Sequence, residues 1–157
     1  MKTNCQSYPV KLVAYSIILM LSCQNCTVRL INLYDETTNK TLTAMQEKTS
    51  KFFVDVKNVL DNAEEAKYEK FKPYYNDMKV SLNVLKVRTA SLDKSELVLK
   101  QIEELTGQLE DLEKFHKTGF VSFAIIAEKE NPLTISHNLM DNSFTSILKF
   151  QNALKRP

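Results

Sequence analysis

The feature that most constrains this chain is the spacing of its apolar residues, which alternates between three and four positions over long stretches. The first stretch runs from about residue 35 to residue 60 and carries Leu42, Met45, Thr49, Phe52, Val56 and Val59 at these intervals. Such spacing places the residues on one face of an α-helix. Glycine occurs twice and proline four times in 157 residues, so residues that interrupt helices are scarce. The chain is therefore predicted to be all-α.

The apolar face of residues 35–60 has two interpretations. Heptad spacing is typical of a coiled coil between two chains. This stretch is shorter than four heptads, however, and its seam includes the aromatic Phe52 and the polar Thr49. These properties favour a helix that packs inside its own bundle.

A second helix is predicted from about residue 73 to residue 89. Its apolar face comprises Tyr75, Met78, Leu82, Leu85 and Thr89. Pro73 suits the first turn of a helix, where a backbone N–H has no intrahelical partner. The charged stretch 63–71 is predicted to be helical and to stop or kink near Pro73, which puts a break between residues 61 and 73.

The third helix is predicted to follow residue 93. Asp93 and Glu96 resemble a capping box, in which each side chain accepts a hydrogen bond from a backbone N–H at the start of the helix. Gly119 stands where glycine commonly ends a helix. The apolar face comprises Val98, Ile102, Leu105, Leu109, Leu112 and either Phe115 or His116, while Glu103, Glu104, Glu110, Asp111 and Glu113 are expected on the other faces.

A last helix is predicted from about His137 or Asp141 to Lys155. Its apolar face comprises Met140, Phe144, Ile147, Leu148, Gln151 and Leu154. The apolar run 120–126 before it is predicted to be a short helix or an irregular segment that covers one end of the bundle. Because the connections are short, neighbouring helices are expected to pack antiparallel. The predicted fold is an antiparallel bundle of three to four helices.

The N-terminal segment has the layout of a signal peptide. An uncharged apolar run from Leu12 to Leu21 follows Lys2 and Lys11 and precedes polar residues. As a helix, residues 12–23 would span about 18 Å, which is short of the roughly 30 Å hydrocarbon core of a bilayer. A permanent transmembrane helix is therefore the weaker interpretation.

The sequence Met20-Leu21-Ser22-Cys23 resembles the lipobox of bacterial lipoproteins. The resemblance implies that Cys23 is lipidated and becomes the mature N-terminus, tethering the chain to a membrane. Gln24 is not the acidic residue associated with inner-membrane retention, which implies the periplasmic face of the outer membrane if the host has two membranes. Ordinary secretion, an uncleaved anchor and a buried helix remain alternatives.

The stretch from Leu33 to Phe120 is similar to uncharacterised small helical lipoproteins of bacteria. The similarity rests on Phe52-Phe53, on Tyr74-Tyr75 and on the residues from His116 to Phe120. It implies no activity. We predict a signal peptide at residues 1–22, a tether at 23–34 and one helical domain at 35–157.

The charge and cysteine content exclude some roles. Removal of residues 1–22 takes away Lys2 and Lys11 and leaves 19 basic against 19 acidic residues. A balanced surface lacks the positive field that holds a phosphate backbone, so no nucleic-acid partner is expected. Of the three cysteines, Cys5 lies in the signal and Cys23 is the lipidation candidate, which leaves Cys26 without an internal disulfide partner. If Cys23 is not processed, it forms a CxxC pair with Cys26, but no second ligand pair accompanies it.

The sequence contains no recognisable catalytic motif. It has no nucleophile elbow, phosphate-binding glycine loop or HExxH motif. His116 and His137 are the only histidines, and a zinc site with Glu113 is conceivable because Glu113 and His116 are one helical turn apart. A histidine that caps or partly fills a helix end is the commoner role. The chain is expected to be neither an enzyme nor a metalloprotein, and no cofactor is expected.

A cluster of aromatic residues next to lysines is the one candidate interaction surface. It comprises Tyr68, Phe71, Tyr74 and Tyr75, beside Lys67, Lys70 and Lys72. Such a stretch can contact a membrane surface or a partner protein. Alternatively, the aromatic rings cover the end of the bundle while the lysines stay in water, and Glu64 and Glu65 reduce the local charge.

These observations predict a membrane-tethered lipoprotein of the cell envelope with a non-enzymatic binding or scaffolding role and an unidentified protein partner. Two alternatives stay open. One is an immunity or exclusion factor against a toxin, phage or plasmid. The other is a carrier whose bundle opens around a lipid or another apolar ligand, lined by residues 120–126.

Overall fold

The structure is a computed structural model that describes residues 34–120 and 131–155. These residues form four α-helices and no strand: α2 (Glu36–Val59), α3 (Tyr68–Ala90), α4 (Glu96–Thr118) and α5 (Pro132–Leu154). The all-α prediction is confirmed. The predicted signal peptide, Cys23, Cys26, the tether up to residue 33 and residues 121–126 lie outside the described residues. Among the described residues 34–120 and 131–155, no helix is both long enough and apolar enough to cross a membrane.

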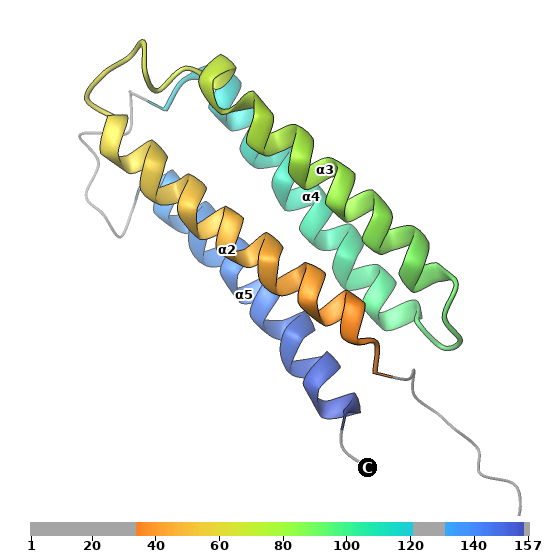
Figure 1. The fold of residues 1–157 in the computed structure, drawn as a ribbon. Coiled ribbons are helices and arrows are strands. Elements are labelled where there is room, and N and C mark those ends of the chain that lie inside the picture. Colours follow the sequence, from red (N-terminus) through yellow and green to blue (C-terminus); the bar gives the residue numbers. More distant parts are fainter. Residues whose placement is uncertain (1–33, 121–130, 156–157) are drawn as a thin grey trace, which may run out of the picture. The chain divides into compact units, whose positions relative to one another are not determined.

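The four helices form an antiparallel ring, in which each helix contacts the one before it and the one after it (Figure 1). Asp35, next to the start of α2, bonds Arg88 near the end of α3, while Lys48 in the middle of α2 pairs with Asp77. Helix α5 closes the ring against α2, where Gln46 donates a hydrogen bond to Asp141. The predicted antiparallel bundle is thus observed with four helices.

The predicted seam of α2 points into this bundle. Leu42, Met45, Thr49, Phe52 and Val56 are buried, whereas Val59 at the end of the helix is half-buried. The hydroxyl of Thr49 lies 3.1 Å from the hydroxyl of Tyr74, so the one polar side chain of the seam has a partner. The heptad face of α2 therefore packs inside its own bundle, as the second interpretation of the sequence predicted. The other helices contribute Tyr75, Met78, Leu82, Leu85, Val98, Ile102, Leu105, Leu109, Leu112, Leu133, Met140, Phe144 and Ile147 to the same core.

The start of α3 corrects the sequence prediction. The helix begins at Tyr68 rather than at Pro73, so Pro73 lies inside it, and residues 63–71 form no separate helix. Proline cannot donate the backbone hydrogen bond that this position normally gives to the carbonyl of Glu69. Tyr68 and Phe71 pack against the core, and this burial offsets the loss of one hydrogen bond close to the helix start.

The predicted capping box before α4 is wrong. The N-cap is Ser95, and the helix begins at Glu96, so Glu96 is the first helical residue instead of the third. Lys94 has a φ of 56°, which turns the chain into the helix two residues later than Asp93 would. At the other end, Gly119 caps α4 as expected: its φ of 102° is one that glycine adopts without strain, and its N–H donates to the carbonyl of His116.

Helix α5 begins earlier than predicted, at Pro132 rather than at His137 or Asp141. The side chain of Asn131 accepts a hydrogen bond from the N–H of Leu133, and Pro132 occupies the first turn. Both residues are typical of a helix start. The side chain of Leu133 is fully buried, so the additional turns are anchored in the core.

Phe53 and Val54 are adjacent in α2 but differ in burial, and they allow a direct test of this packing. Phe53 is fully buried, whereas Val54 is 55% exposed. We expect Phe53→Ala to lower the free energy of unfolding by about 3–5 kcal/mol because it leaves a cavity. Val54→Ala should change it by less than about 0.5 kcal/mol. Urea denaturation followed by circular dichroism measures both, and equal effects would contradict the orientation of α2.

Candidate functional site

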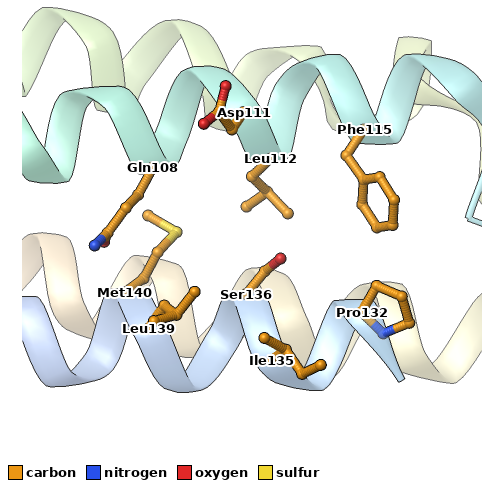
Figure 2. A pocket seen from close by; sticks show the side chains of 9 residues that line it. All are labelled: Gln108, Asp111, Leu112, Phe115, Pro132, Ile135, Ser136, Leu139 and Met140. Atoms are coloured by element: carbon orange, nitrogen blue, oxygen red, sulfur yellow. The ribbon is translucent and has the colours of Figure 1, made fainter. Parts of the chain in front are cut away.

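An apolar groove lies between α4 and α5 and is here called the α4–α5 groove (Figure 2). Its volume is about 310 Å³. Ile135 and Leu139, one turn apart on α5, remain 45% and 52% exposed at its edge. It is lined by Gln108, Asp111, Leu112 and Phe115 of α4 and by Pro132, Ile135, Ser136, Leu139 and Met140 of α5.

The groove continues along the two helices as a more polar hollow. Gln108 and Leu139 line both parts, and the second part adds Gln101, Glu104, Asn142, Ser143 and Ser146. The amide of Gln108 donates a 2.9 Å hydrogen bond to the hydroxyl of Ser143, which ties α4 to α5 between the two parts. The surface between the helices thus changes from apolar near Pro132 to polar near Ser146.

The charged side chains that line the groove are both acidic. Asp111 lines the apolar part and Glu104 the polar part, and no lysine or arginine of the described residues lines either part. Asp111 pairs with Lys114 at 3.1 Å, but the two side chains are 78% and 73% exposed. An ion pair exposed to this extent contributes little free energy, so Asp111 can exchange its partner readily.

The pattern of the sequence did not reveal this groove. Its prediction started the last helix at His137 or Asp141 and so left Ile135 outside any helix. Asn131 and Pro132 are the signal that would have extended the helix backwards and placed Ile135 and Leu139 one turn apart. That these two residues face a gap beside α4 follows only from the packing.

The aromatic residues singled out in the sequence lie mainly against the core. Tyr75 is fully buried, and Tyr68, Phe71 and Tyr74 are half-buried. The ring of Tyr74 stacks on Phe52 with 4.1 Å between their centroids. The lysines of this stretch, Lys67, Lys70 and Lys72, are exposed, and the first two pair with Glu64 and Glu65. This arrangement agrees with the interpretation in which the rings cover the end of the bundle.

His116 holds three parts of the chain together. Its Nε2 lies 2.9 Å from the carbonyl oxygen of Ala66, and its Nδ1 lies 2.9 Å from the hydroxyl of Tyr75. Because a carbonyl can only accept, Nε2 carries the proton and Nδ1 accepts from Tyr75. The imidazole also stacks on Phe120 at 4.0 Å. Burial lowers the pKa of His116 and raises that of the Tyr75 hydroxyl, so both groups stay neutral.

Glu113 is buried, contrary to its predicted place on an outer face of the helix. It is 6% exposed and accepts hydrogen bonds from Tyr68, Lys79 and Lys117. Burial by itself would raise the pKa of Glu113, but the three hydrogen bonds outweigh it and lower the pKa to about 2. The carboxylate is therefore ionised and fully paired at neutral pH.

The three residues considered for a zinc site do not meet. His137 stacks on Phe53 with 4.4 Å between the rings, while His116 and Glu113 bond the partners described above. Within residues 34–120 and 131–155, no group of three or more histidine, cysteine, aspartate or glutamate side chains is placed to hold a metal ion.

Comparison with models of protein families, with curated proteins and with solved structures gives no match to this chain. The resemblance to bacterial lipoproteins stays a prediction from the sequence.

The neutral state of His116 predicts a loss of stability in mild acid. Its pKa is lower in the folded chain than the unfolded value of 6.5, so the stabilisation is complete above pH 6.5 and decreases as the pH falls towards the folded value. His137 behaves in the same way, since burial and Lys57 lower its pKa. In a His137→Gln background, we expect His116→Gln to flatten the remaining slope of the unfolding free energy between pH 7 and pH 5.

Urea denaturation at several pH values measures this slope, which cannot exceed about 1.4 kcal/mol per pH unit for one proton. The range above pH 5 avoids most of the titration of carboxylates such as Glu113, whose unfolded pKa is 4.5. Identical slopes in the single and double variants would show that His116 does not carry the effect.

Proposed function

We propose that this chain is a membrane-tethered lipoprotein of the cell envelope with a non-enzymatic binding or scaffolding role, and that it binds its partner through the α4–α5 groove. The groove is the observation that carries the proposal. Ile135 and Leu139 are about half exposed beside the apolar side chains of Leu112 and Met140. A concave apolar surface accompanied by a few polar residues is the usual form of a binding site.

The tether is supported by the sequence alone. The apolar run Leu12–Leu21 and the residues Ser22-Cys23 match the pattern of a lipoprotein signal. Each buried methylene of an acyl chain contributes about 0.8 kcal/mol, so a multiply acylated cysteine holds a domain on a membrane stably. If the host has two membranes, Gln24 favours the outer membrane through the resemblance to lipoproteins.

A non-enzymatic role agrees with how the buried polar groups are used. Among the described helices, the buried carboxylate and imidazole belong to Glu113 and His116, and their hydrogen bonds join α3, α4 and the connection before α3. Neither faces the α4–α5 groove, whose polar residues are amides, hydroxyls and two exposed carboxylates. Such a set recognises a partner but offers no activated nucleophile.

An apolar ligand is the second candidate, because the lining near Leu112, Leu139 and Met140 is mostly apolar. The core residues are packed in one contiguous cluster. We therefore expect a lipid to lie in the surface groove. The carrier predicted from the sequence would instead open its bundle around the ligand.

The two neighbouring cysteines allow a controlled test of the tether. In bacterial cells that express the full chain, labelling with radioactive palmitate should be lost in Cys23→Ala and retained in Cys26→Ala. Only the cysteine next to Ser22 stands in the lipobox position. Labelling that persists in Cys23→Ala would contradict lipidation at this residue.

Site-specific photocrosslinking tests the binding role. We expect p-benzoylphenylalanine at position 139 to give an adduct after irradiation of intact cells, because Leu139 lies at the edge of the groove. The same probe at position 84 of α3 is the control, since Val84 is 58% exposed but does not line the groove. Mass spectrometry identifies the adduct as protein or lipid. Equal adducts at both positions, or none at position 139, would contradict binding through the groove.

A further inference from the structure

We infer that the α4–α5 groove receives an amphipathic helix of a partner protein whose polar side carries lysine or arginine. This inference rests on the binding role proposed above and specifies the chemistry of the partner. It follows from the length of the groove, from its change from apolar to polar and from the sign of its charges.

The length of the groove matches a helix. Its lining runs along α5 from Pro132 to Ser146, which at about 1.5 Å per residue is about 21 Å. A helix of about 14 residues covers this distance. Two antiparallel helices with a gap between their side chains form the surface on which an additional helix packs, with apolar residues at every third or fourth position inserted into the gap.

The pattern along the groove requires an amphipathic occupant. Leu112, Ile135, Leu139 and Met140 offer apolar contacts near one end, while Glu104, Asn142 and Ser146 offer polar contacts near the other. A wholly apolar ligand would leave the polar end covered and unpaired, which costs free energy. A helix with one apolar face and one polar face satisfies both ends.

The charges select a basic helix. Glu104 and Asp111 line the groove, and no described lysine or arginine lines it. Opposite charges at the edge of an interface increase the association rate and exclude partners of the same sign. A lysine or arginine on the partner can pair with Glu104, and another can replace the exposed Lys114 at Asp111.

The same charges disfavour the other occupants. A second copy of the chain, packed face to face through this groove, would bring its own Glu104 and Asp111 against these two carboxylates. An anionic membrane surface would be repelled for the same reason. Within residues 121–130, Glu128 and Glu130 outnumber the single Lys129, so this segment has the wrong net charge.

A designed peptide pair tests the inference on the full chain in phosphatidylcholine nanodiscs. The probe is a fluorescein-labelled 14-residue peptide of leucine and lysine, with leucines at helical spacing, and its match has glutamate in place of lysine. We expect the lysine peptide to bind at least tenfold more tightly than the glutamate peptide by fluorescence anisotropy. Ile135→Ser with Leu139→Ser should weaken it at least tenfold, and Glu104→Lys with Asp111→Lys should reverse the preference.

Two matched controls lie outside the groove. Glu110→Lys changes the charge of α4 on the side that faces α3, and Val84→Ser removes an exposed apolar side chain from α3. Both should leave the dissociation constant within twofold of the wild type. If the serine double variant loses its helical circular dichroism signal, the charge reversal at positions 104 and 111 still decides the test.

Equal binding of the two peptides, or a preference that survives the charge reversal, would overturn the inference. If the wild type sediments as a dimer and the charge reversal alters this dimerisation, the groove binds a second copy of the chain. That result would also overturn the inference. Failure of the peptides together with a specific protein or lipid adduct at position 139 would leave the binding role standing. Failure of both experiments would remove the binding role as well.

Discussion

Each of the four helices has one apolar face, and only the interior of the ring can cover all four faces together. This constraint orders the rest of the structure. Because of it, Phe52 and Phe53 of α2 pack against the other helices in the core, and the residues on the remaining faces stay at the surface. The helices alternate in direction because short connections return the chain to the same core. Where the cover is complete, as around Tyr75, the polar atoms must find partners inside the bundle.

The polar residues enclosed by this packing act as links between elements. His116 joins α4 to Tyr75 of α3 and to Ala66 in the connection before α3. Glu113, one turn earlier, gathers Tyr68, Lys79 and Lys117 around a single carboxylate. These groups explain why an aromatic and lysine-rich stretch can resemble an interaction surface while its rings close the end of the bundle. An apolar groove lies instead between α4 and α5, where Ile135 and Leu139 of α5 are about half exposed beside the side chains of α4.

Much of the fold could be predicted because the spacing of apolar residues repeats over several turns. The buried faces of α2, α3, α4 and α5 agree with that spacing from Leu42 to Ile147. The ends of the helices were harder to predict from the sequence, because a cap depends on one or two backbone angles. Because Lys94 has a positive φ, α4 begins after Ser95 and not after Asp93. Helix α3 begins at Tyr68, which packs against the core, and therefore includes Pro73. Favourable packing outweighed the local preference of proline.

The sequence by itself determined the helical class, the residues of each apolar face, the absence of a recognised catalytic motif and the lipoprotein-like N-terminus. Only the tertiary structure decided which side chains meet across helices. It buried Glu113, because Lys79 of another helix and Tyr68 supply hydrogen bonds that no local pattern reveals. It also left Ile135 and Leu139 beside a groove, because α4 and α5 approach without filling the space between them. Contacts between distant segments depend on how the helices are rotated against one another, and periodicity within one helix does not contain that information.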